Sequence, residues 1–264
     1  MAADFPGSGL HRASRRIWLV ASHTLSEALR LRLAGFFAGV GVALVLMGLR
    51  LQDFNFGAAE LKFLTDIGLG GIGLLGTMLA ALTMAQVFFD DLENGFAACV
   101  LAKAVRRWEY LCGLLAGVMG LLVLFIAGLA ALLALLLEIR GAQLGAAFVR
   151  LPVFLQACAL VWLKTTLVAA MTLLVCSYAG SALFASCAGL LLAAIGHLRV
   201  WAGSGTGLGC LRIWPDLGTF DVDPLMSTGR ALGWNGMLAL GTYWILFMML
   251  FAALAAYVFE HREL

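Results

Sequence analysis

The side chains that could act as catalysts are few in this chain and lie far apart. Ser181 and His197 are the pair best suited to serve as nucleophile and base, but sixteen residues separate them on one expected helix. At 1.5 Å per residue they are roughly 24 Å apart, whereas a nucleophile and its base must lie within hydrogen-bond reach. His11, His23 and His261 flank the apolar segments without carboxylate partners at a spacing suited to a metal. We therefore expect neither a catalytic residue nor a metal site.

A phosphate-binding loop is the next kind of site to consider. The chain has three lysines, and none stands in the GxxxxGK[ST] pattern that cradles ATP phosphates. The glycine-rich stretch AGSGTGLG, Ala202 to Gly209, lacks the strand and helix that flank such loops. We interpret it as a flexible or re-entrant outer loop, and we expect no cofactor in this chain.

Lys164 is a more serious candidate, because it stands near the middle of an apolar run. An ionisable group at that depth is costly to bury and is a functional hypothesis by default. It would line a translocation path, bind an anionic substrate or relay a proton, as in a secondary transporter. Against this, the two halves of the chain show no internal repeat, and no partner carboxylate stands at matching depth. Snorkelling, or pairing within a dimer, explains the residue equally well.

Composition determines which elements must position these residues. The 264-residue chain is 63% hydrophobic with a mean hydropathy of +1.00, whereas soluble domains are about 45–50% apolar. The chain is therefore predicted to be an integral membrane protein. Its net charge of only +2 gives no basic face for nucleic acid.

Six segments are long and apolar enough to span a bilayer, which takes about 20 residues each. They predict an all-α integral membrane protein with a single transmembrane domain over residues 1–264. The segments are Leu33–Leu51, Ile67–Phe89, Tyr110–Leu137, Leu151–Val175, Ser181–Leu198 and Gly236–Phe259.

Residues 12–31, ahead of the first span, have the pattern of an amphipathic helix. One face carries apolar and small residues at intervals of three and four, while Arg16, His23, Glu27 and Arg30 fall on the other. Such a helix lies along the membrane surface. An ordinary cytosolic extension of the first span is the alternative. The residues of the apolar face are Ile17, Val20, Ala21, Thr24, Leu25, Ala28 and Leu29.

The distribution of basic residues predicts the orientation. With a cytoplasmic amino terminus, nine Lys and Arg residues fall inside and seven outside, with Lys164 within a span. The inner ones crowd into the amino-terminal segment and the loop after the second span, whereas the outer ones are scattered. An even number of spans then places both termini in the cytoplasm.

That inner loop, DDLENGFAACVLAKAVRRWEYLCGLLAG from Asp90 to Gly117, concentrates charge in a chain with only 12% charged residues. Apolar side chains recur in it with a helix-like rhythm, and Gly95 just before them allows a turn. We expect a short helix across the inner membrane surface, with a charged side able to dock a soluble partner. The alternative is that Arg106, Arg107 and Trp108 only anchor the third span. The apolar residues are Phe96, Val100, Leu101 and Val105; the solvent-facing ones are Glu93, Lys103, Arg106, Arg107 and Glu109.

The order Glu93, Gly95 and then VLAKAVRRWEYLCGLLAG resembles the first cytoplasmic loop of permease subunits of type-2 ABC exporters. The amphipathic entry helix, the six spans, IWPDLGTFDVDP before the last span and the terminal FEHREL resemble the same family. Two departures are Ala104, where the family often has Pro, and Phe96, where it often has Thr.

The resemblance implies a permease in a bacterial inner membrane, paired with a second, identical or different, permease subunit. A separate ATPase, which binds ATP and Mg²⁺, would dock beneath and move the loop helix. The alternatives that remain are a secondary transporter using Lys164 and a structural membrane subunit. The residues implied in ATPase coupling are Glu93, Gly95, Leu101, Lys103, Arg106, Arg107, Trp108 and Glu109.

Overall fold

The computed structural model describes residues 7–48, 60–102, 105–144, 151–198, 214–223, 225 and 231–261. All regular elements in these ranges are helices, as the sequence predicts. They are α1 (Gly7–Arg30), α2 (Arg32–Gly48), α3 (Glu60–Glu93), α4 (Phe96–Ala102), α5 (Arg107–Leu144), α6 (Leu151–Tyr178), α7 (Ala182–Leu198), the short 3₁₀ helix η4 (Leu217–Phe220) and α9 (Trp234–Glu260).

Four of the described helices, α3, α5, α6 and α9, are long and apolar enough to cross a membrane. A fifth span is possible if α1 and α2 are counted together, although they meet at a bend of 62°. The chain is thus a multi-pass membrane protein, while the figure of six spans stays a prediction. One of the predicted spans, α7, has 17 residues and is about 26 Å long. It is shorter than the hydrocarbon core of a bilayer, which is about 30 Å thick.

Two helices extend well past the predicted span ends. α3 has 34 residues and α5 has 38, which correspond to about 51 Å and 57 Å. The predicted spans end where charged residues begin, but backbone hydrogen bonding continues the helices through those residues. Both helices therefore project beyond a bilayer core, and their polar ends can carry a site outside the lipid.

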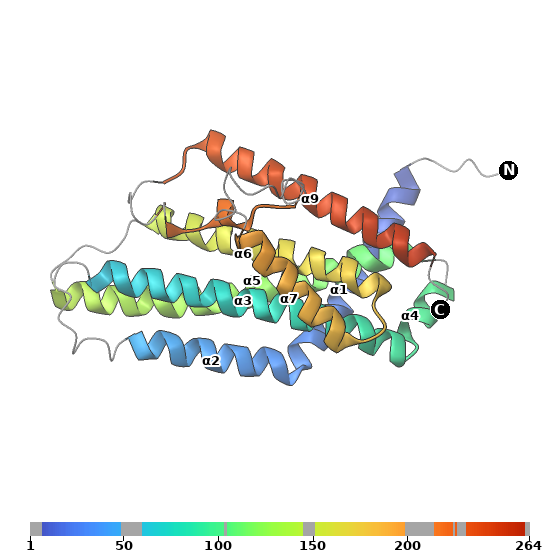
Figure 1. Cartoon of the computed structure of the whole chain (residues 1–264), viewed down its shortest axis with the longest axis horizontal. Helices are drawn as coiled ribbons and strands as arrows, with labels where there is room; N and C mark the ends of the chain where they lie inside the picture. The colour runs from blue at the N-terminus through green and yellow to red at the C-terminus, as the bar shows by residue number, and fades with distance from the viewer. Residues whose placement is uncertain are drawn as a thin grey trace.

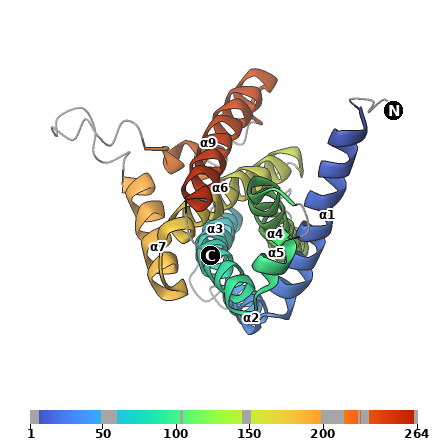
Figure 2. The ribbon, with the colours of Figure 1, turned by 90° about the vertical axis from the view of Figure 1, so that its right-hand side faces the viewer.

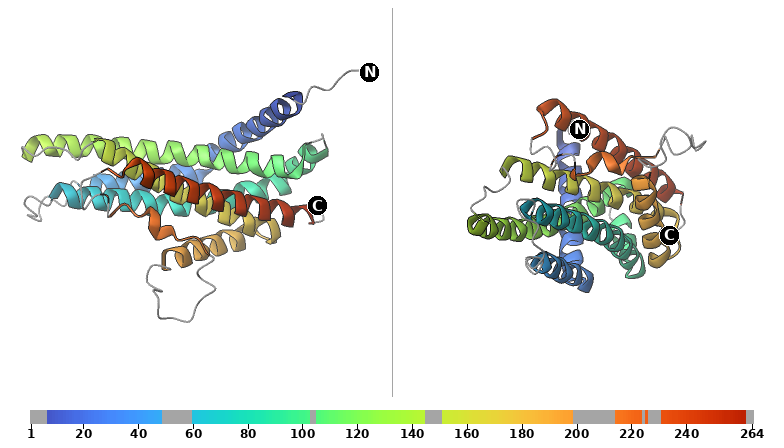
Figure 3. Two further views of the ribbon diagram at one scale, coloured as in Figure 1. Left: turned by 90° about the horizontal axis from the view of Figure 1, so that it is seen from above. Right: turned by 60° about the vertical axis from the view of Figure 1, so that its left-hand side comes forward.

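The long helices run side by side along the molecule, and α4 lies at one end of the bundle (Figure 1). The first turns of α1 and the last turn of α9 lie at this same end (Figures 1 and 3). Viewed from that end, α1 lies beside α5 on one side of the molecule and α7 lies on the other (Figure 2). We call this end, with α4 and the helix termini around it, the α4 end.

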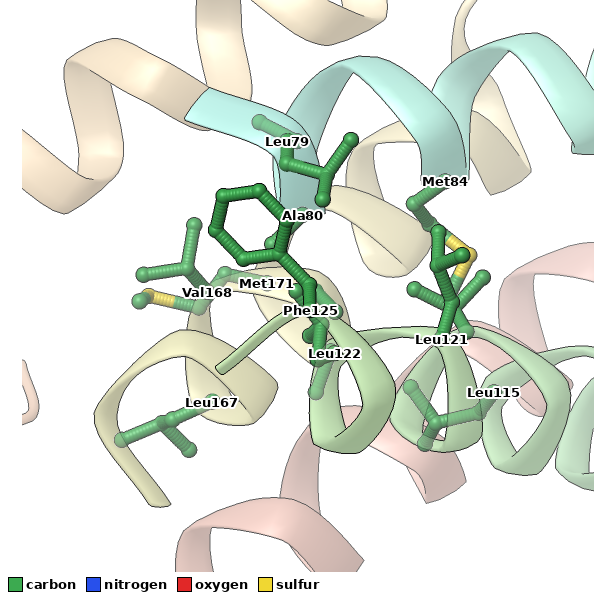
Figure 4. Close-up of a cluster of buried hydrophobic side chains, with 14 of the residues drawn as sticks. Leu79, Ala80, Met84, Leu115, Leu121, Leu122, Phe125, Leu167, Val168 and Met171 are labelled. Carbon is green, nitrogen blue, oxygen red and sulfur yellow. The ribbon is translucent and has the colours of Figure 1, made fainter. Parts of the chain in front are cut away.

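The centre of the bundle is an apolar contact between α3, α5 and α6 (Figure 4). Leu79 and Met84 from α3, Leu122 from α5, and Leu167 and Met171 from α6 are all fully or almost fully buried. By contrast, few of the large apolar side chains of α9 are buried, and exposed ones such as Leu246 and Met249 recur along the helix. An exposed apolar helix of this length requires lipid or another chain around it.

α1 packs closely against α5, because glycines face it there. A Cβ atom at Gly117 would lie 2.6 Å from Cβ of Thr24 and 2.8 Å from the carbonyl oxygen of Ala21. Gly113 faces Val20 in the same way. The side of α1 that the sequence assigned to the membrane surface therefore packs in part on α5: Val20, Ala21, Thr24 and Ala28 are buried, while Leu29 is exposed.

Gly117→Ala should lower stability, since the new methyl group meets backbone and cannot be accommodated by rotating a side chain. Overpacking of this kind costs about 1–3 kcal/mol. Gly128→Ala on the same helix has nothing within 4 Å of the new methyl and should gain up to about 1 kcal/mol of helix propensity. Thermal unfolding of the purified chain in detergent measures both. Equal melting temperatures for the two variants would contradict the close α1–α5 contact.

Candidate functional site

The turn that leads into α4 is built on Gly95. α3 ends at Glu93, where the amide of Asn94 donates to the carbonyl of Asp90 at 2.9 Å and that of Gly95 to the carbonyl of Leu92 at 3.2 Å. Gly95 has φ of 70°, the left-handed conformation that ends helices and that glycine adopts without a steric penalty. The predicted role of Gly95 in turning the chain is confirmed.

α4 lies with one side against the bundle and the other in solvent. Ala97 is buried, Val100 packs on the core, and Phe96 stacks on the ring of His23 with 4.2 Å between centroids and 8° between planes. Cys99 is exposed on the outer side. The predicted helix is thus present. Leu101 lies within it, with a side chain outside the described part, and Lys103 lies outside the described residues.

Among the predicted docking residues, Glu93, Arg106 and Trp108 are exposed at the α4 end. Trp108 is 43% exposed. These three side chains remain available to a partner. Arg107 and Glu109, in contrast, make contacts within the chain.

Arg107 binds the end of α9. Its Nη1 donates to the carbonyl oxygens of Phe259 at 2.9 Å and Glu260 at 2.8 Å. Its guanidinium also lies over the Phe259 ring, 5.9 Å from the centroid. An arginine in this position satisfies carbonyls that a helix end leaves without partners and complements the negative end of the helix dipole. Arg107 therefore ties the start of α5 to the end of α9.

Glu109 is only 4% exposed, so the expectation that it faces solvent is wrong. Its Oε2 accepts from the backbone amide of Arg106 at 3.3 Å, as the third residue of a helix does in a capping box. The same oxygen pairs with Nη1 of Arg16 on α1 at 3.5 Å. Periodicity alone placed Glu109 on an outer face, but α1 lies across that face and supplies the counter-ion.

A second polar cluster lies at Asp91, near the end of α3. Asp91 is 1% exposed, and Oδ2 accepts a hydrogen bond of 2.7 Å from the hydroxyl of Tyr110. Glu27 of α1 lies beside the Asp91 carboxylate. Nδ1 of His23 lies 3.8 Å from Oε2 of Glu27. Candidate ligand atoms of His23, Glu27 and Asp91 all lie within 4.8 Å of one another.

The sequence did not reveal this cluster. The expectation that His23 has no carboxylate partner is wrong, and no metal site was expected. The spacing of His23 and Glu27, four residues apart on one helix, was a visible signal. Asp91 could not be added from spacing, because it comes from another helix.

Lys164 also has a partner that the sequence did not reveal. Its Nζ lies 2.6 Å from Oδ1 of Asp221, and the lysine side chain is 13% exposed. The expectation that no carboxylate stands at its depth is therefore wrong. The segment before α9 folds back against α6 and α7, with Leu217 and Phe220 fully buried, and this carries Asp221 to the lysine.

Hydrogen bonds hold that returning segment in place. The Asp216 side chain accepts from the amide of Gly218 at 2.9 Å and so caps η4. The amide of Asp216 donates to the hydroxyl of Tyr243 on α9 at 2.7 Å. The Lys164–Asp221 pair is thus part of a connection between α6, η4 and α9.

Ser181 has a local structural role. It precedes α7, and its Oγ accepts from the amide of Phe184 at 3.4 Å, as a residue capping a helix start does. His197 lies in the last turn of the same helix. The two residues are not brought together, in agreement with the distance expected from the sequence.

No protein-family model matches the chain, and no curated protein sequence matches it. The function is therefore inferred from the residues and their geometry.

Lys164→Met should destabilise the chain, because Asp221 loses its counter-ion within a partly buried contact. The Asp221 side chain is 41% exposed and can be hydrated, so the expected cost is up to about 1 kcal/mol. Asp221→Asn should have a similar effect, and the double variant should cost less than the sum of the two. Thermal unfolding of the four proteins measures the coupling. Strictly additive effects would mean that the pair contributes no interaction of its own.

Proposed function

We propose that this chain is a membrane permease subunit of an ABC exporter, driven by a separate ATPase that docks at the α4 end. The observation that carries the proposal is α4 itself. A seven-residue helix lies at one end of the bundle, leaves Cys99 exposed, and follows a turn with exposed Glu93. This arrangement supports the role that the sequence resemblance implies for the loop.

The contacts of α4 and its flanks support a role in transmitting motion. α4 touches α3 and α5 directly, and Phe96 stacks on His23 of α1. Arg16 and Glu109 join α1 to α5, and Arg107 joins α5 to α9. Because packed interiors transmit displacement rather than absorb it, a push on α4 would reach four of the helices. A two-state permease biased by nucleotide in its partner needs a connection of this kind.

The candidate coupling residues then divide into two groups. Glu93, Arg106 and Trp108 are exposed, so they are the proposed contacts with the ATPase, together with Leu101 and Lys103 from the resemblance. Gly95, Arg107 and Glu109 act within the chain: Gly95 forms the turn, and the two charged residues connect α5 to α9 and to α1.

Orientation and partners follow from the same proposal. The start of α1, α4 and the end of α9 lie together (Figure 1), which supports both termini and the loop being on the cytoplasmic side of a bacterial inner membrane. ATP and Mg²⁺ would bind to the partner ATPase. A second permease subunit, identical or different, would complete the translocation path.

One observation favours the secondary-transporter alternative. Lys164 has a carboxylate partner, and paired charges within a membrane protein commonly mark a substrate or proton path. In the proposed permease the same pair would border the path. Co-purification separates the three functions: an exporter retains an ATPase, a secondary transporter retains no partner, and a structural subunit retains a larger assembly that does not transport.

Arg106→Glu tests the docking surface without disturbing the contacts of Arg107. Like charge across an interface costs several kcal/mol, so at least a tenfold loss of co-purifying ATPase is expected. The tagged chain is purified from membranes of its own source, and ATPase and ATP hydrolysis are measured per molecule of chain. Glu138→Arg, which reverses an exposed charge near the other end of α5, is the matched control and should change neither quantity.

Arg107→Glu should behave differently, since it removes the cap on α9. It should lower the melting temperature and the amount of chain in the membrane. If Arg106→Glu also lowers only the membrane level and leaves ATPase per molecule unchanged, the anchoring alternative holds. Absence of any ATPase from the wild-type preparation would contradict the proposed function.

A further inference from the structure

We propose that His23, Glu27 and Asp91 bind a divalent transition-metal ion of the Zn²⁺ type at the α4 end. The proposal does not rest on the exporter function, because it follows from the ligand geometry alone. One imidazole and two carboxylates, from two helices, offer ligand atoms that lie within 4.8 Å of one another.

The donor set fits such an ion. Zn²⁺ takes histidine nitrogen and carboxylate oxygen at about 2.0–2.2 Å, and three protein ligands with one open position form a common zinc site. A tetrahedral ion with bonds of that length holds its ligand atoms roughly 3.4 Å apart. Nδ1 of His23 and Oε2 of Glu27 are already 3.8 Å apart. Side-chain adjustments of about an ångström would complete the site.

The state of Glu27 is the second observation. Its Oε2 is buried and accepts no hydrogen bond among the described residues, although it faces His23. A buried acceptor without a donor is costly. The charged groups that act on Glu27 are Asp91, Asp90 and His23, so negative charge predominates around it. A bound cation would coordinate this oxygen more closely than the His23 ring does at 3.8 Å, and it would offset the repulsion among the carboxylates.

Neighbouring side chains hold two of the ligands in place. The Tyr110 hydroxyl donates to Oδ2 of Asp91, which orients the carboxylate and leaves Oδ1 for a ligand. Outer hydrogen bonds of this kind tune and orient metal ligands. The stacked Phe96 ring restricts rotation of His23. The His23 side chain is 45% exposed, which gives an ion a way in.

An ion at this position would cross-link α1 to α3 beside the first residue of α4. The metal would add a direct bond between α1 and α3, two helices that already pack against each other. The expected consequence is a metal-dependent rise in stability at the α4 end.

The test uses the full chain in detergent, stripped with EDTA and dialysed, then titrated with Zn²⁺ by calorimetry. One ion per chain and a melting temperature several degrees higher are expected. Glu27→Gln preserves shape but weakens the ligand, and His23→Gln alters an exposed side chain; each should lower Zn²⁺ affinity at least tenfold. His261→Gln, another exposed histidine, is the matched control and should leave affinity unchanged.

Cobalt substitution distinguishes this site from the cysteines. Co²⁺ bound to His23 and carboxylates gives weak visible bands without the intense near-ultraviolet band of a thiolate ligand. Absence of Zn²⁺ binding to the wild-type chain would overturn the proposal, as would binding that both variants retain or a thiolate band in the cobalt spectrum. Should Glu27→Gln fail to fold, His23→Gln decides the outcome by itself.

Discussion

The α4 end depends on the burial of acidic side chains in an otherwise apolar bundle. Asp91 and Glu109 are almost fully buried, and a buried carboxylate is tolerated only where donors or counter-ions satisfy it. Tyr110 donates a hydrogen bond to Asp91. Glu109 pairs with Arg16 and accepts a hydrogen bond from a backbone amide. Because Arg16, His23 and Glu27 all come from α1, the position of that helix on α5 determines whether these charges are satisfied.

The close contact of α1 with α5 makes this arrangement possible. Gly113 and Gly117 lack side chains where α1 crosses, so the two backbones approach each other, as small residues allow between helices in membranes. A wider separation would withdraw Arg16 from Glu109, and His23 and Glu27 from Asp91. The apolar packing and the polar contacts at the α4 end are therefore parts of one interface, and the proposed metal and docking surfaces are both adjacent to it.

Much of the local structure followed from the sequence. Long apolar runs predicted the helices, the three-to-four spacing predicted α1, and Gly95 predicted the turn into α4. The predicted helices were too short, because a span predicted from hydropathy ends at the first charged residue. The backbone of α3, by contrast, remains helical through Asp90 and Asp91. The partners of Glu109 and Lys164, and Asp91 beside His23, were missed for a different reason: each lies on another helix or on the segment before α9.

The sequence by itself determined that the chain is apolar, helical and membrane-spanning, because these properties depend on composition and on the spacing of residues within a few turns of one helix. It also determined which residues carry charge at the α4 end. Only the tertiary structure decided which of those charges are available. Arg106 is exposed, whereas Arg107 donates hydrogen bonds to the end of α9 and Glu109 forms an ion pair with Arg16. Side chains of neighbouring residues point in different directions around a helix. The helices packed beside them determine whether each side chain is exposed to water or contacts another residue.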